Sequence, residues 1–183
     1  MDGGFGGVGV SVKTLVTGGI RSGKSRCAET LLADEPGVTY VVPGPLWPDD
    51  PEWVARVAAH RQQRPAHWTT VVDQDVAGVL GRLSGPGLID CLNTWLTGQL
   101  DEVQAWSTTG WEGLLEQRIT AVVEAWTASP HRLVAVTNEV GFGLVSEHRS
   151  GRIFVDWLGR LNQRIAAASD EVILIVAGRS LRL

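Results

Sequence analysis

Short apolar runs alternate along the chain with longer segments in which apolar residues recur every three or four positions. The runs are rich in valine, leucine and isoleucine and stop at or near glycine, proline or aspartate, which is typical of buried strands. They predict strands at residues 13–17, 39–42, 69–72, 88–89, 133–137 and 172–176. Because helices separate these runs, the pattern indicates an α/β fold with a mainly parallel sheet flanked by helices.

The segments between the strands predict helices. Residues 153–168 show this most clearly, because four apolar residues lie four, three and four positions apart and so share one face. They are Phe154, Leu158, Leu161 and Ile165. The other helices are expected at residues 24–33, 51–63, 76–83 and 111–128. Between residues 90 and 110 the pattern does not separate helix from strand.

Composition narrows the function classes. The 183 residues suit one domain, expected at 13–183 after a glycine-rich flexible tail at 1–12. The net charge of −4 does not favour a nucleic-acid partner. No apolar run reaches the roughly 18 residues of a membrane span. The two cysteines, Cys27 and Cys91, form no CxxC pair, which favours a reducing cytoplasm.

The segment after the first strand, residues 18–25, reads GGIRSGKS and matches the pattern G-x-x-x-x-G-K-[ST]. In this pattern, here called the phosphate loop, backbone N–H groups surround a phosphate and glycines allow its close approach. The helix that follows directs its positive end at the anion. A glycine-rich turn with an incidental lysine would lack this strand-and-helix context. We therefore expect the nucleotide phosphates to contact Gly18, Gly19, Ile20, Arg21, Ser22, Gly23, Lys24 and Ser25.

Two residues of the phosphate loop have separate expected roles. Lys24 would contact the β- and γ-phosphates during catalysis, and the Ser25 hydroxyl would bind Mg²⁺. A magnesium ion also needs a carboxylate at the end of another buried strand. Asp90 is the favoured candidate and Glu139 is its competitor. Because aspartate is also common at helix starts, a capping role is the alternative for Asp90.

A histidine lies among arginines in the predicted helix at residues 51–63. One helix face carries Trp53, Arg56 and His60 at spacings of three and four, and Arg64 would continue it four residues on, just past the predicted helix end. Arginines bind phosphate bidentately, and neighbouring cations favour a neutral imidazole, which can attack phosphorus. From spacing alone, a solvated helix face is the commoner explanation of such a cluster.

Several segments, taken in order, resemble the bifunctional adenosylcobinamide kinase / adenosylcobinamide-phosphate guanylyltransferase family of cobalamin biosynthesis. They are residues 15–25, 56–68, 90–97, 136–143 and 159–172. The phosphate loop alone is generic, whereas the segments H-R-x-x-R-P, N-E-V-G and N-Q-R in this order are specific. The resemblance implies a P-loop NTPase fold with a RecA-like core, and an assembly similar to the propeller-shaped trimers of the family.

The resemblance also implies two reactions that use Mg²⁺, with ATP and GTP as substrates. In the first, a nucleoside triphosphate phosphorylates the aminopropanol hydroxyl of the corrinoid adenosylcobinamide. In the second, a histidine attacks the α-phosphate of GTP, and the resulting GMP–histidine passes GMP to adenosylcobinamide phosphate. The product is adenosylcobinamide-GDP.

Matching the family motifs residue by residue places the nucleophilic histidine at His60 and the acidic residue after an apolar strand at Asp90. Two further segments would line the nucleotide site. Their residues are Val42, Pro43, Gly44, Arg61, Gln62, Gln63 and Arg64.

One departure from the family concerns guanine recognition. Where the family usually has a glutamate, this chain has Val72, followed by Asp73. Either Asp73 replaces that glutamate or the selectivity for guanine is weakened. Two alternatives therefore accompany the bifunctional enzyme: a kinase that keeps only the first reaction, and a nucleotide-dependent interaction module with a protein partner.

Overall fold

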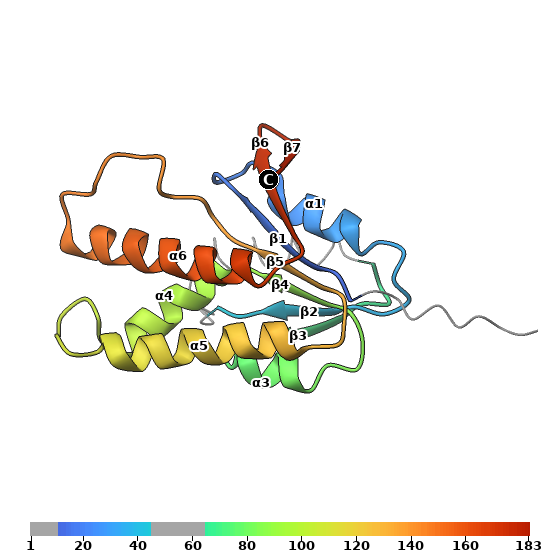
Figure 1. Cartoon of the computed structure of the whole chain (residues 1–183), viewed down its shortest axis with the longest axis horizontal. Helices are drawn as coiled ribbons and strands as arrows, with labels where there is room; N and C mark the ends of the chain where they lie inside the picture. The colour runs from blue at the N-terminus through green and yellow to red at the C-terminus, as the bar shows by residue number, and fades with distance from the viewer. Residues whose placement is uncertain (1–10, 45–64) are drawn as a thin grey trace, which may run out of the picture.

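The computed structural model of the protein describes residues 11–44 and 65–183. Its centre is a seven-stranded sheet with the order β3-β2-β4-β5-β1-β6-β7 (Figure 1). The strands are β1 (Lys13–Gly18), β2 (Thr39–Val42), β3 (Thr69–Val72), β4 (Gly87–Asp90), β5 (Leu133–Val136), β6 (Glu171–Val176) and β7 (Arg179–Arg182). Neighbouring strands are parallel except β6 and β7, which form an antiparallel hairpin at one edge.

Helices cover both faces of the sheet. They are α1 (Lys24–Leu31), α3 (Val76–Gly81), α4 (Leu92–Glu102), α5 (Glu112–Ala128) and α6 (Arg149–Ala167). Figure 1 shows α1 on one side of the strands and α3, α4, α5 and α6 on the other. No helix in the described ranges is both long and apolar enough to cross a membrane.

The apolar runs of the central strands are continuous because these strands contribute to two separate cores. On β1, Leu15 packs with the core under α3 to α6, whereas Val16 packs with the core under α1. On β4, Ile89 and Leu88 divide in the same way. Successive strand side chains point to opposite faces, so a strand buried on both sides needs apolar residues at every position.

The six predicted strands are confirmed, with ends that agree or differ by one residue. Predicted helices are confirmed at α1, α3, α5 and α6, but α6 begins at Arg149, four residues earlier than expected. The start of α6 is held by tertiary contacts, which apolar periodicity does not reveal. The Arg149 guanidinium donates to the carbonyl oxygens of Ala105, Trp106 and Thr108. Residues 1–10 of the tail expected at 1–12 lie outside the described residues, as does the helix expected at 51–63.

Two elements were not predicted. Helix α4 fills part of the ambiguous segment, and it is buried around a wide arc that includes Gly98 and Gln99, which blurs its helical period. Strand β7 has four exposed residues, so it carries no apolar signal.

Strand order brings the segments that follow β1, β4 and β5 to one edge of the sheet. Because β4 pairs with β5 and β5 with β1, their carboxyl ends lie side by side. Asp90 is level with Val136 in this register, and Val136 is level with Val16. In parallel sheets, ligands bind outside this carboxyl edge.

Candidate nucleotide-binding site

The phosphate loop leaves β1 at Gly18 and enters α1 at Lys24. Gly18 has φ 149°, and a Cβ there would lie 2.3 Å from the carbonyl oxygen of Ile175 on β6. Gly23, the residue before α1, has φ 100°. Both conformations favour glycine, so the glycines of the motif are required by the path of the chain. Gly19, Ile20 and Arg21 are exposed at the surface of this loop.

Lys24 is the first residue of α1 and its side chain turns back into the loop. Only 7% of the residue is exposed, and Nζ donates a 2.6 Å hydrogen bond to the carbonyl oxygen of Gly19. Burial lowers the pKa of Lys24 from its ordinary 10.5, and the nearby Cys91 and Asp90 partly oppose this effect. The ammonium group is therefore held in a partly desolvated position, where an anionic phosphate would interact with it strongly.

A hollow of ≈ 320 Å³ lies over the loop and the first turn of α1. Its lining consists of Arg21, Ser22, Gly23, Lys24, Ser25, Arg26 and Glu29. Three of these residues are cationic, and the backbone N–H groups at the start of α1 add a favourable dipole. The composition of the hollow therefore suits a polyphosphate.

Asp90 ends β4 and lies at the carboxyl edge of the sheet, the edge from which the phosphate loop leaves β1. Its Oδ2 accepts a 2.5 Å hydrogen bond from the hydroxyl of Tyr40, and its charge acts on Lys24. Cys91 is the residue that precedes α4, and it makes no capping hydrogen bond. Asp90 therefore lies outside the capping position of α4, and the capping alternative is wrong.

Glu139, the competitor of Asp90, is engaged in its own loop. Its Oε1 accepts a 2.7 Å hydrogen bond from the N–H of Gly141. Its backbone N–H donates to the carbonyl oxygen of Gly18 at 3.0 Å. Glu139 thus supports the end of β1 through its backbone, while its carboxylate shapes the loop after β5.

The segment from Val42 to Gly44 lies at the carboxyl end of β2. Pro43 and Gly44 are buried, and a Cβ on Gly44 would lie 2.5 Å from Cγ2 of Thr94 in the first turn of α4. This segment therefore packs against the start of α4, which follows Asp90 closely in the sequence. The other expected nucleotide contacts, His60 and Arg61 to Arg64, lie outside the described residues.

Asp73, the expected substitute for the family glutamate, is bonded within the protein. Its Oδ2 forms a 2.6 Å ion pair with Arg82, and its Oδ1 accepts from the N–H of Asp75 at 2.9 Å. Val72, at the end of the edge strand β3, is 47% exposed. Both oxygens of the Asp73 carboxylate are thus used to form the turn before α3.

Sequence reasoning missed a link between α6 and the end of β5. The Thr137 hydroxyl donates to Oδ1 of Asn162 at 2.7 Å, and Nδ2 of Asn162 donates to the carbonyl oxygen of Asn138 at 3.0 Å. The N-E-V-G and N-Q-R segments are therefore partners in space. Each segment was visible in the sequence, but nothing there connected them.

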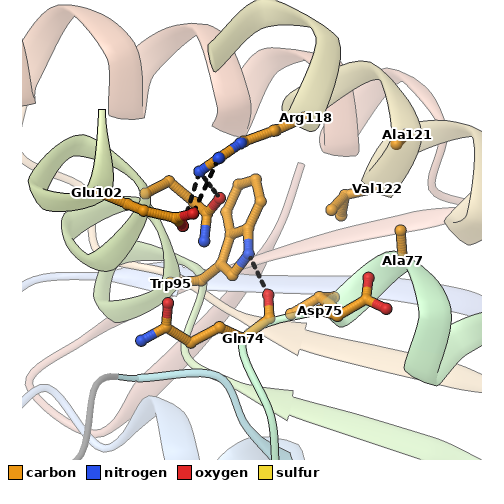
Figure 2. A pocket seen from close by; sticks show the side chains of 10 residues that line it. Gln74, Asp75, Ala77, Trp95, Glu102, Arg118, Ala121 and Val122 are labelled. Carbon is orange, nitrogen blue, oxygen red and sulfur yellow. Dashed lines mark hydrogen bonds and ion pairs between the residues drawn. The ribbon is translucent and has the colours of Figure 1, made fainter. Parts of the chain in front are cut away.

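A second hollow, of ≈ 250 Å³, lies on the opposite face, between α3, α4 and α5 (Figure 2). Arg118, the cation on its wall, donates to Oε1 of Gln99 and to both carboxylate oxygens of Glu102. The indole N–H of Trp95 donates to the carbonyl oxygen of Gln74 at 3.0 Å. Because these polar groups are paired with one another, the phosphate loop is the better phosphate site.

Comparison with solved structures agrees with this fold. The chain is similar to an ATPase of the type III secretion system of pathogenic bacteria, with a TM-score of 0.58 and 10% identity. The match covers 94% of this chain and 58% of that one. At this identity the likeness shows the fold alone, a P-loop NTPase sheet flanked by helices.

Sequence comparison gives the family. Residues 14–183 match the family model described as cobinamide kinase / cobinamide phosphate guanyltransferase. The chain is 38% identical over 180 residues to the bifunctional adenosylcobalamin biosynthesis protein CobU of Salmonella typhimurium, covering 92% of this chain and 98% of that protein. It is 36% identical over 174 residues to CobP of Pseudomonas aeruginosa, covering 91% and 94%. The chain therefore belongs to the cobinamide kinase / cobinamide phosphate guanyltransferase family.

Proposed function

We propose that the chain phosphorylates adenosylcobinamide and then transfers GMP from GTP to the product, giving adenosylcobinamide-GDP. The observation that carries this proposal is the family match over residues 14–183 combined with an intact phosphate loop. The loop places a buried lysine beside a carboxylate at the carboxyl edge of the sheet. Nucleotide phosphates and a corrinoid acceptor would meet at this edge.

In the first reaction, the acceptor hydroxyl attacks the γ-phosphorus of the bound triphosphate. The bond between that phosphorus and the β–γ bridging oxygen breaks, the nucleoside diphosphate leaves, and the hydroxyl proton passes to a base or to water. Lys24 would bind the β- and γ-phosphate oxygens, which carry the negative charge of the transition state. Backbone N–H groups of residues 18–25 would hold the phosphates in line for attack.

The residues at this edge fit a magnesium ion. Mg²⁺ is held in such sites by one or two protein oxygens together with phosphate oxygens and waters. The Ser25 hydroxyl and the Asp90 carboxylate offer that set, and the described residues contain no larger cluster of acidic, cysteine or histidine ligands. When bound, Mg²⁺ would neutralise part of the phosphate charge. The residues that hold it would be Ser25 and Asp90.

In the second reaction, a ring nitrogen of His60 would attack the α-phosphorus of GTP. A nitrogen–phosphorus bond forms, the bond to the β-phosphate breaks, and pyrophosphate leaves. A phosphate oxygen of adenosylcobinamide phosphate then attacks the same phosphorus and releases the neutral imidazole. The segments 42–44 and 61–64 would line this nucleotide site, as the family motifs imply.

The assembly and the compartment belong to the same proposal. The family resemblance supports a homotrimer, and two unpaired cysteines support the reducing cytoplasm.

The covalent step gives the sharpest test. The purified chain is incubated with GTP labelled at the α-phosphate and with Mg²⁺, and protein-bound label is counted after denaturation. We expect a label that is stable in alkali and lost in acid, as for a phosphoramidate on histidine. His60→Ala should abolish it.

His67→Ala is the matched control, because His67 is an exposed histidine a few residues further along the chain. It should keep the label. Absence of any covalent nucleotide in the unmodified chain would reject the guanylyltransferase reaction, and equal labelling of the two variants would reject His60 as the nucleophile.

A kinase without the second reaction is the second candidate, and the surroundings of β3 favour it. The side chain of Val72 offers guanine no hydrogen-bonding group, and both carboxylate oxygens of Asp73 are bonded to Arg82 and Asp75. This candidate predicts that the chain phosphorylates adenosylcobinamide but does not convert adenosylcobinamide phosphate and GTP to the GDP form. Detection of that product by mass spectrometry would eliminate it.

A further inference from the structure

The hairpin formed by β6 and β7 contacts the phosphate loop through its turn. Val176 is level with Arg179 in the antiparallel register, so Ala177 and Gly178 form a two-residue turn. Their φ angles are 50° and 77°, as expected for the turn type that suits such hairpins. The N–H of Gly178 donates a 3.0 Å hydrogen bond to the carbonyl oxygen of Ser22.

This hydrogen bond fixes the orientation of a peptide group within the phosphate loop. The peptide between Ser22 and Gly23 is trans, so its C=O and N–H point in opposite directions. With the Ser22 oxygen held by the hairpin, the N–H of Gly23 points away from the hairpin. Phosphate binding in such loops depends on N–H groups with fixed directions.

Packing on either side of the hydrogen bond is close. A Cβ on Gly23 would lie 3.7 Å from Cα of Gly178, and one on Gly18 would lie 2.3 Å from the carbonyl oxygen of Ile175. Gly18 and Ile175 are also level in the pairing of β1 with β6. The loop is thus supported along one side by the strand that leads into the turn.

The turn and β7 contribute little to the buried core. All four residues of β7 are exposed, as are Ala177 and Gly178. Ala177 has a left-handed conformation that is unfavourable for a residue with a Cβ. Unfavourable backbone conformations persist where the surroundings enforce them, and they gather at functional sites.

We propose that Gly178 is a positioning residue for nucleotide binding, which holds the Ser22–Gly23 peptide so that its N–H is available to a phosphate. This inference rests on the proposed function, because it assigns to the hairpin a part in the same nucleotide site. Gly178 acts through the loop and touches no substrate.

The test compares two glycines with the same backbone requirement. Gly178 and Gly110 have φ 77° and 83°, both are exposed, and a Cβ at either would meet no atom within 4 Å. Valine at either site strains the backbone, but of these two glycines Gly178 is the one with a backbone hydrogen bond to the phosphate loop. The affinity of the full chain for ATP with Mg²⁺ is measured by calorimetry for the unmodified protein, Gly178→Val and Gly110→Val.

Loss of one hydrogen bond that orients the loop should weaken ATP binding about fivefold to tenfold in Gly178→Val. Gly110→Val should bind ATP as the unmodified chain does, although both variants lower the melting temperature. If Gly178→Val does not fold, Gly178→Ala introduces the same strain in a milder form and should show a smaller loss of affinity.

Equal ATP affinities in the two folded variants would overturn the positioning role of Gly178. A different failure, no ATP binding by the unmodified chain, would overturn the proposed function itself. In steady-state assays of the kinase reaction, a positioning role predicts a raised KM for ATP with a smaller change in kcat.

Discussion

The hydroxyl of Tyr40 on β2 donates a 2.5 Å hydrogen bond to Oδ2 of Asp90 at the end of β4. Tyr40 is 1% exposed, so its ring is fixed by the core beneath α1. The two strands are neighbours in the sheet. One strand thereby orients the carboxylate that the next strand presents to Lys24.

Tyr40→Phe removes this hydroxyl and keeps the aromatic ring in the core. A hydrogen bond to a charged group contributes about 1.5–3 kcal/mol, so denaturant unfolding should show a loss near the lower end of that range. Without the hydroxyl, Asp90 is less well oriented, and the Mg²⁺ concentration that half-saturates the kinase reaction should rise. An unchanged Mg²⁺ requirement would show that Tyr40 does not orient a metal ligand.

Gly18→Ala and Gly19→Ala separate packing from exposure within the phosphate loop. A Cβ on Gly18 would clash with the Ile175 carbonyl oxygen, whereas one on Gly19 would meet nothing within 4 Å. We expect Gly18→Ala to lower the free energy of unfolding by about 2 kcal/mol or more, as for strained or overpacked sites. Gly19→Ala should unfold like the unmodified protein. Similar melting temperatures for the two variants would contradict the close packing of β1 on β6.

The lowered pKa of Lys24 predicts how ATP binding depends on pH. Phosphates favour the charged amine, so binding should raise its pKa, and affinity should fall as pH rises through the pKa of the free protein. Because burial lowers that pKa below 10.5, the fall should begin at a lower pH than for an exposed lysine. Calorimetry with ATP between pH 7 and 10 measures this, since the adenine base does not lose a proton there.

Lys24→Met is the control for the pH profile. It removes the amine and retains an unbranched side chain, so ATP should bind more weakly but with little dependence on alkaline pH. Cys91, which also acts on Lys24, has its pKa raised to about 11 by burial and so stays protonated over most of this range. The same alkaline fall in Lys24→Met would assign it to another group.

Asn162 connects α6 to the loop after β5, and its removal should be costly. Asn162→Ala leaves the hydroxyl of Thr137 without its acceptor, and Thr137 is fully buried. An unsatisfied buried polar group costs about 1–3 kcal/mol, which urea unfolding can measure. Gln163→Ala, at an exposed position of the same helix, should change stability by less than about 0.5 kcal/mol. If the two variants are equally stable, the link does not hold the loop.

The sequence predicted those parts of the fold in which local pattern and burial agree. Strands such as β1 and β4 are apolar at successive positions because both of their faces are covered, and that signal needs no tertiary knowledge. The hairpin strand β7 was missed because its residues are exposed and its pairing with β6 depends on a two-residue turn. The phosphate loop was predictable because Gly18 and Gly23 adopt positive φ angles that favour glycine, so the sequence motif reflects the local backbone conformation.

Contacts between distant segments could not be predicted from the sequence pattern. Asp90 was selected from its place after an apolar run, but its hydrogen bond to Tyr40 depends on the order of β2 and β4. The support of the phosphate loop by Gly178 likewise requires β6 to lie beside β1. Gly178 and Ser22 lie 156 positions apart in the sequence, so periodicity cannot pair them; strand order brings them together.

The most direct test of the account is a complete reaction with the purified chain. Adenosylcobinamide, ATP, GTP and Mg²⁺ are incubated with the protein, and the corrinoids are identified by mass spectrometry. We predict adenosylcobinamide phosphate as the first product and adenosylcobinamide-GDP as the second, with both lost in Lys24→Met. Corrinoid that stays unmodified while the chain is folded would contradict the assignment of phosphate transfer to this loop.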